Sequence, residues 1–267
     1  MFVKVSPQSL LELALTDPAR NYFICYTLLG NQPYEASWAI IGNEDDPQSN
    51  TPNLAVFLRK SGLIQIAKQP TFDVEHYKLS LYRLLSEISW RQANVAEAFA
   101  KIIGDMPFQI QVEKGARIAK CTAIDYRTTQ SNGVEIRCLD ESYIPAITDL
   151  YKTVFESFAR PEYMIEKLKS GRGRVIGAFR DGRMVSVAQT DFERADFALI
   201  VGVATDPEHQ GKGYGRTLME ALCKVLLNEG KMLYLQYDSP VAGSLYESMG
   251  FKTVEQIMHI KNLVYYE

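Results

Sequence analysis

The sequence predicts a layered α/β or α+β fold, in which helices cover a mixed sheet. Apolar runs of strand length alternate with helical apolar patterns along the 267 residues. Asp181-Gly182, between two apolar runs, predicts a β-hairpin. The apolar positions of residues 213–229 fall on one helical face, as expected of a helix packed on a sheet. A chain of this length is also long enough for two domains.

Residues 1–130 are expected to form an N-terminal α/β domain. Ser6-Pro7 precedes a helical apolar pattern, with proline suited to the first helical position. Two longer helices are predicted at 76–88 and 93–103. Short apolar runs separated by turn signals occupy 22–29, 36–41, 54–58 and 63–67, and strands are predicted at 108–112 and 118–126.

The polar segment 128–133 predicts a linker, with a boundary near residue 131. Residues 131–267 are therefore expected to form the second domain. Its elements are predicted, in order, as a strand at 134–139, helices at 144–158 and 161–170, strands at 174–180, 184–190 and 197–204, a helix at 213–229, a strand at 232–237, a helix at 241–249, and a strand pair from Phe251 to the end.

Composition excludes several classes of protein. With 46% hydrophobic and 23% charged residues, the chain is unlike collagen, low-complexity or disordered sequences. A formal net charge of -3 argues against a nucleic-acid or anionic-membrane partner. The four cysteines lack Cys-x-x-Cys spacing, and with only three histidines no metal site is expected. The N-terminus lacks a signal-peptide pattern and no apolar run could span a bilayer, so a cytoplasmic protein with mostly buried, reduced thiols is expected.

The segment from Gln210 to Arg216 combines three glycines with the start of a predicted helix. Glycines allow a ligand to approach the backbone closely, and the first turn of a helix presents unpaired N–H groups. The helix dipole adds positive potential, so a pyrophosphate fits this position. The Lys212 and Arg216 side chains add charge. A glycine-rich turn without a ligand is the alternative.

A second pattern, Ala-x-x-x-Tyr-x-x-x-Gly-Phe, follows the next strand. It places Ala242 and Tyr246 on one helical face, with Gly250 as a C-cap. A tyrosine that only packs in the core would show the same spacing.

Together, residues 197–251 resemble the GCN5-related N-acetyltransferase (GNAT) superfamily. The stretch from Gly202-Val203 to Gly213-Tyr214 is most similar to the branch called FR47-like. The resemblance implies a GNAT-type fold, with a mixed, mostly antiparallel sheet flanked by helices. The N-terminal domain, which carries no CoA motif, is then expected to be a degenerate GNAT-like half. The resemblance implies acetyl-CoA as co-substrate, no metal, and a small-molecule primary amine as acceptor.

The resemblance also assigns residues. The strand backbone at Val203, Ala204 and Thr205 would bind the pantetheine arm and orient the thioester carbonyl. The pyrophosphate would be enclosed by Gln210, Gly211, Lys212, Gly213, Tyr214, Gly215 and Arg216. Tyr246 would act as general acid toward the departing thiolate, which is plausible chemistry because phenols and thiols both titrate above neutrality. Ser239 stands where many members have asparagine, and its shorter side chain puts that cofactor contact in doubt.

An amine must lose a proton before it can attack, and Asp191 or Glu193 is a candidate general base. An exposed turn without a catalytic role is the alternative for this acidic segment. Tyr151, Phe155 and Phe158 could wall the acceptor pocket, although helical spacing also fits a core role. Three functions stay open at this point: an N-acetyltransferase, a non-catalytic CoA-binding module, and a transferase of a longer acyl group. A homodimer is compatible with each.

Overall fold

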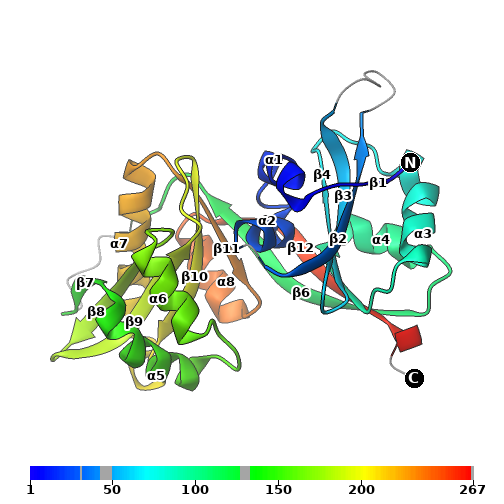
Figure 1. Cartoon of the computed structure of the whole chain (residues 1–267). Helices are drawn as coiled ribbons and strands as arrows, with labels where there is room; N and C mark the ends of the chain where they lie inside the picture. The colour runs from blue at the N-terminus through cyan, green and yellow to red at the C-terminus, as the bar shows by residue number, and fades with distance from the viewer. Residues whose placement is uncertain (31, 43–49, 127–132, 266–267) are drawn as a thin grey trace. The chain divides into compact units, whose positions relative to one another are not determined.

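The computed structural model describes residues 1–30, 32–42, 50–126 and 133–265, and the chain forms two compact units (Figure 1). Unit 1 comprises Met1–Ile118 and Thr253–Glu267, and unit 2 comprises Ala119–Lys252. These units do not follow the boundary expected near residue 131. That boundary and residues 128–132 of the expected linker lie outside the described residues.

Unit 1 contains one sheet with helices on it. Its elements are β1 (Val3–Lys4), α1 (Leu11–Thr16), α2 (Tyr22–Leu29), β2 (Tyr34–Ile41), β3 (Pro52–Arg59), β4 (Leu63–Lys68), α3 (Lys78–Glu87), β5 (Gln92–Ala96), α4 (Glu97–Gly104), most of β6 (Ile110–Cys121) and most of β12 (Lys252–Asn262). Neighbouring strands from β1 to β4 are antiparallel, β4 and β5 are parallel, and β12 pairs antiparallel with β5. The apolar faces of α3 and α4 bury Leu81, Leu85 and Ile103 against this sheet.

Unit 2 is built in the same way. Its elements are β7 (Glu135–Leu139), α5 (Ile144–Val154), α6 (Pro161–Lys169), β8 (Val175–Arg180), β9 (Arg183–Asp191), β10 (Phe197–Thr205), α7 (Tyr214–Asn228), β11 (Met232–Tyr237) and α8 (Pro240–Ser248). The strand order is β11-β10-β9-β8-β7, antiparallel except for the parallel pair β10 and β11. Helices α5 and α6 cover one face of the sheet, and α7 and α8 cover the other (Figure 1).

The order of elements repeats along the chain. From β1 to β6, the chain runs strand, two helices, three strands, helix, strand, helix, strand, and the same order recurs from β7 to β12. The closing strand of the second series, β12, completes unit 1, where Ile257 and Ile260 are buried. The predicted fold class is thereby confirmed, including an N-terminal half with the topology of the C-terminal half.

Most predicted elements are present. The Asp181-Gly182 hairpin joins β8 to β9, with both turn residues at positive φ. As expected, most cysteines are buried thiols, with Cys138 the exposed one. Among the described residues, no helix is long and apolar enough to cross a membrane.

The predictions for four segments are corrected. The helix expected at 93–103 is strand β5 followed by α4, because 92–96 alternates as a sheet segment whose buried side chains are small. The two strands expected at 108–112 and 118–126 are one strand, β6, since its exposed middle still pairs in the sheet. The helix expected at 144–158 ends at Val154, where Phe155 becomes extended. The strand pair expected from Phe251 is one strand, β12, followed by a 3-10 turn.

Candidate functional site

The parallel strands β10 and β11 pair over only part of their length. Their register runs from Phe197 opposite Met232 to Ile200 opposite Leu235. Both strands are described in full, and β10 continues to Thr205 without a further register partner on β11. The edge of β10 from Val203 to Thr205 therefore has backbone groups that β11 does not use, as the splayed-strand prediction requires.

A bulge lies at the point where the two strands part. The register between β9 and β10 shifts between Val201 and Ala204, and Gly202 has a φ of 59°. The Tyr151 hydroxyl donates a 2.6 Å hydrogen bond to the Gly202 carbonyl. A Cβ built on Gly202 would overlap this hydroxyl, so glycine is required both for the backbone conformation and for the close approach.

The loop before α7 leaves a group of amides without protein partners. Gly211 and Gly213 have φ of 75° and 80°, and Gly213 is the N-cap of α7 without a side-chain cap. In the described part of the chain, no acceptor is found for the backbone N–H groups of residues 211–216, and Thr217 donates to the Gly213 carbonyl. Free amides at the N-terminus of a 15-residue helix are donors of the kind that suits an anion. The predicted pyrophosphate position therefore has the required open donors.

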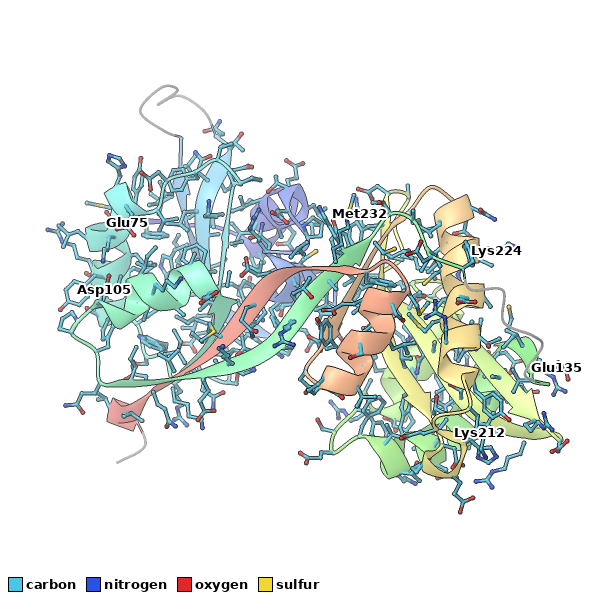
Figure 2. All side chains as sticks on the ribbon, turned by 180° about the vertical axis from the view of Figure 1, so that it is seen from behind. Glu75, Asp105, Glu135, Lys212, Lys224 and Met232 are labelled. Atoms are coloured by element: carbon cyan, nitrogen blue, oxygen red, sulfur yellow. The ribbon has the colours of Figure 1, made fainter. Side chains whose placement is uncertain are left out.

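The polar side chains of the loop hold the loop itself. Gln210 Nε2 donates to the Thr205 carbonyl at 3.2 Å, and Lys212 Nζ donates to the Glu208 carbonyl at 2.9 Å. Both side chains are exposed. Figure 2 shows Lys212 at the end of α7 opposite to that of Lys224. The Lys212 ammonium is thus exposed to solvent while it is bonded to the Glu208 carbonyl.

The side chain of Arg216 is placed differently from the prediction. Its guanidinium donates to Glu220 Oε1, Ser248 Oγ and the carbonyls of Asp125 and Ser248, at 2.7–3.3 Å. Arg216 is only 9% exposed, so its charge is used to join α7 to the end of α8. That this side chain supplements the pyrophosphate site stays a prediction, although its donors already have protein acceptors in this structure.

Tyr246 lies on α8 beside the end of β11. Its ring contacts that of Tyr237, the last residue of β11, at a centroid distance of 5.9 Å. Tyr246 is 6% exposed, and no partner for its hydroxyl occurs among the described residues. Burial raises the pKa of Tyr246 to about 12. The phenol is therefore protonated at neutral pH and able to donate.

Ser239 and the candidate bases are already engaged. Ser239 is the exposed N-cap of α8 and accepts from the Ala242 N–H at 3.5 Å. Asp191 is 1% exposed and accepts from the Tyr163 hydroxyl at 2.8 Å, and burial raises its pKa. Glu193 accepts a bidentate pair of hydrogen bonds from Arg174.

The location of these two carboxylates also argues against a role as base. Asp191 pairs in register with Leu199, in the part of β10 that is still paired with β11, and Glu193 lies beyond it. Both carboxylates therefore lie toward the closed end of the strand pair, away from Val203–Thr205. The structure therefore gives no support to Asp191 or Glu193 as general base, and the sequence pattern alone could not show this.

Three potential metal ligands, Asp206, Glu208 and His209, lie within 4.8 Å of one another. The Asp206 carboxylate already accepts from Arg183 at 2.7 Å and from the Glu208 N–H at 2.9 Å. Asp206 is thus the N-cap of the 3-10 turn Pro207–His209.

The corresponding loop of unit 1, which follows β4, turns carbonyl oxygens toward a lysine. After β4, the Lys68 ammonium donates to the carbonyls of Gln69, Pro70 and Phe72 at 3.2, 3.1 and 2.9 Å. These carbonyl oxygens accept from Lys68 and cannot donate to an anion as free N–H groups do. The N-terminal half thus repeats the topology but not the amide site.

Comparison with known proteins agrees with this site. Residues 144–251 match the acetyltransferase (GNAT) family model, which covers less than half of the chain. A mycothiol acetyltransferase from Kocuria rhizophila is 45% identical over 56 residues, which are 20% of this chain and 18% of that protein. The chain thus matches less than a fifth of the length of this curated relative.

Solved structures show the same fold across nearly the whole chain. An acetyltransferase of the GNAT family from Colwellia psychrerythraea has a TM-score of 0.66 at 12% identity, with 98% of this chain and 99% of that one covered. A tandem GNAT protein from the clavulanic acid biosynthesis pathway has a TM-score of 0.62 at 14% identity, with 97% of each chain covered. The fold is therefore GNAT-type, and the repeated element order is that of a tandem arrangement.

Proposed function

We propose that residues 144–251, with their match to the acetyltransferase (GNAT) family, form the catalytic part of an acetyl-CoA-dependent N-acetyltransferase. The observation that carries the proposal is the group of free amides at residues 211–216, beside the open edge of β10. Within the family we assign the chain to the FR47-like branch, on the stretch from Gly202 to Tyr214.

Binding and orientation follow from the backbone. The amides of 211–216 would hold the diphosphate of acetyl-CoA, with Lys212 adding charge. The part of β10 that β11 does not pair, Val203–Thr205, would bind the pantetheine arm, and an N–H of this part would polarise the thioester carbonyl. Holding both reactants in the gap between β10 and β11 would supply much of the rate by positioning.

Proton transfer would use Tyr246 and water. The amine nitrogen bonds to the acetyl carbon while the carbon–sulfur bond breaks, and Tyr246 returns a proton to the thiolate. Tyr246 is then reprotonated from solvent. Because Asp191 and Glu193 are engaged elsewhere, water is proposed to take one proton from the ammonium before the neutral amine attacks, and a second proton from the nitrogen once it has bonded to the acetyl carbon.

The acceptor is proposed to be a primary amine of a small molecule. The short match to a mycothiol acetyltransferase and the net charge of -3 both favour this class over a nucleic acid. Phe155 and Phe158 pack on Tyr151 with ring centroids 5.1 and 5.5 Å away, and both are half-buried. They would form the apolar wall of the acceptor pocket. We place the activity in the cytoplasm, where acetyl-CoA and reduced thiols coexist, and a homodimer is compatible with it.

Binding and turnover test the proposal separately. Acetyl-CoA at about 100 times its dissociation constant should stabilise the fold by about 2.7 kcal/mol, measured by thermal unfolding. Release of CoA thiol with a panel of amines should then show turnover. Binding without turnover would favour a non-catalytic CoA-binding module. Faster turnover with a longer acyl-CoA would favour a transferase of a longer acyl group. The absence of any stabilisation would exclude all three.

A further inference from the structure

A buried chain of hydrogen bonds ends on the bulge of β10. Lys167 Nζ donates to Gln189 Oε1 at 2.5 Å, Gln189 Nε2 donates to the Tyr151 hydroxyl at 2.5 Å, and Tyr151 donates to the Gly202 carbonyl at 2.6 Å. The chain passes from α6 through β9 and α5 to β10. Lys167, Gln189 and Tyr151 are each 2% exposed, so solvent does not compete for these bonds.

The Lys167 ammonium fixes the donor-to-acceptor direction of every bond in this chain of hydrogen bonds. A protonated lysine can only donate, so the amide oxygen of Gln189 must face Lys167 and its NH₂ must face Tyr151. The tyrosine oxygen then accepts from Gln189, and the hydroxyl proton has the Gly202 carbonyl as its acceptor. A buried cation two side chains away thus determines that the bulge carbonyl receives a hydrogen bond.

Fixing this carbonyl also fixes the next amide. In a planar trans peptide, the C=O and the following N–H point in opposite directions. The Gly202 carbonyl is held toward Tyr151, so the Val203 N–H is held pointing away from α5. Gly202 at φ 59° could otherwise adopt several conformations, because glycine imposes little restriction of its own.

We propose that Lys167, Gln189 and Tyr151 are positioning residues that lock the Gly202–Val203 peptide, so that the Val203 N–H is presented to the thioester carbonyl of acetyl-CoA. This rests on the proposed function, since it needs acetyl-CoA on the β10 edge. None of the three side chains touches the reacting atoms. Their effect is to preorganise a donor that must not rotate during the reaction.

The test uses acetyl-CoA labelled with ¹³C at the thioester carbonyl, and isotope-edited infrared spectroscopy of the full chain. In the wild-type complex, the carbonyl band should lie at lower frequency than in free acetyl-CoA, because the Val203 N–H polarises it. Tyr151→Phe removes the donor to Gly202, so the band should return toward the free value. CoA itself lacks the thioester carbonyl, so its dissociation constant should stay within about 2-fold of the wild-type value.

Gln189→Glu is a second variant, which keeps the size and shape of the side chain at this position. Its carboxylate accepts from Lys167 and also from Tyr151, so the hydroxyl proton turns away from Gly202. A purely structural role predicts little change, since the volume is kept and Lys167 gains an ion pair. Positioning predicts loss of the band shift and a fall in kcat on the order of 10-fold or more, with KM for acetyl-CoA nearly unchanged. This variant keeps the test informative if Tyr151→Phe does not fold.

Tyr163→Phe is the matched control. It removes another hydroxyl of unit 2, one that donates to Asp191 and not to the bulge. The band shift and turnover should be kept in this variant. If wild type binds no acetyl-CoA, the proposed function fails. If wild type binds but its band is not shifted, or if the shift survives in both Tyr151→Phe and Gln189→Glu, the positioning role is wrong while the proposed function stands.

Discussion

At the scale of single residues, Gly211 and Gly230 form a natural pair for comparison. Their φ values are 75° and 79°, and a Cβ added to either would meet no atom within 4 Å. Alanine should therefore cost about 1 kcal/mol of folding free energy at each position through backbone strain alone. Only Gly211 lies in the amide loop. Gly211→Ala should weaken acetyl-CoA binding in calorimetry, and Gly230→Ala should not. Equal affinities in the two variants would argue against the amide site.

Tyr246 provides the next residue-scale prediction. With a pKa raised to about 12 by burial, the phenol stays protonated throughout the neutral range. Tyr246→Phe should lower kcat by about 100-fold, within the range for loss of a general acid, while acetyl-CoA affinity stays near wild type. Steady-state kinetics with the amine found in the panel measures this.

Tyr237→Phe is the control for that variant. Tyr237 packs against the Tyr246 ring, and its hydroxyl is 3.4 Å from Glu247 Oε1. Removing this hydroxyl should leave kcat nearly unchanged. If both variants lose affinity and turnover together, Tyr246 is a packing residue, which was the alternative interpretation of its spacing in the sequence.

At the scale of elements, a variant of Arg216 distinguishes a structural role of this residue from a ligand-binding role. Its four hydrogen bonds join α7 to the end of α8 and to the carbonyl of Asp125. Arg216→Met should cost about 3 kcal/mol in urea unfolding, because it leaves Glu220 and the carbonyls of Asp125 and Ser248 without this partner. Lys212→Ala, on an exposed side chain, should change stability by no more than about 0.5 kcal/mol. Unchanged stability in Arg216→Met, with weaker acetyl-CoA binding, would restore the predicted phosphate role.

Lys167 on α6 gives a pH dependence with a defined sign. Burial lowers the pKa of Lys167 to about 8, opposed by Asp191, whereas an unfolded lysine titrates near its ordinary value of 10.5. Between these values the unfolded chain binds more protons, so the free energy of unfolding should rise with pH. Below pH 8 both states are protonated and this contribution is constant. Urea unfolding at pH 7.5 and 9.5 should show the rise in wild type, and Lys167→Met should lack it.

The elements also show what the sequence could and could not predict. The amphipathic α7 and the Asp181-Gly182 turn were predictable, because period and turn chemistry are local. Strand β5 was mistaken for helix, since its alanines suit a helix and only pairing with β4 and β12 makes it a strand. The contact between Tyr151 and Gly202 joins residues 51 positions apart, and no local pattern signals it. The engagement of Asp191, Glu193 and Arg216 was hidden for the same reason.

At the scale of the whole molecule, one topology occurs twice along the chain, while the described residues show the glycine-rich amide loop in the second half only. The loop after β10 offers free N–H groups at residues 211–216, whereas the loop after β4 turns carbonyls toward Lys68. Removing the Lys68 cation would not create donors, because carbonyl oxygens accept only. Calorimetric titration should therefore give one acetyl-CoA per chain, and Lys68→Met should keep both that stoichiometry and the affinity. Two equivalents in wild type, or a second site gained in Lys68→Met, would show that the N-terminal half keeps a cofactor site built from other groups.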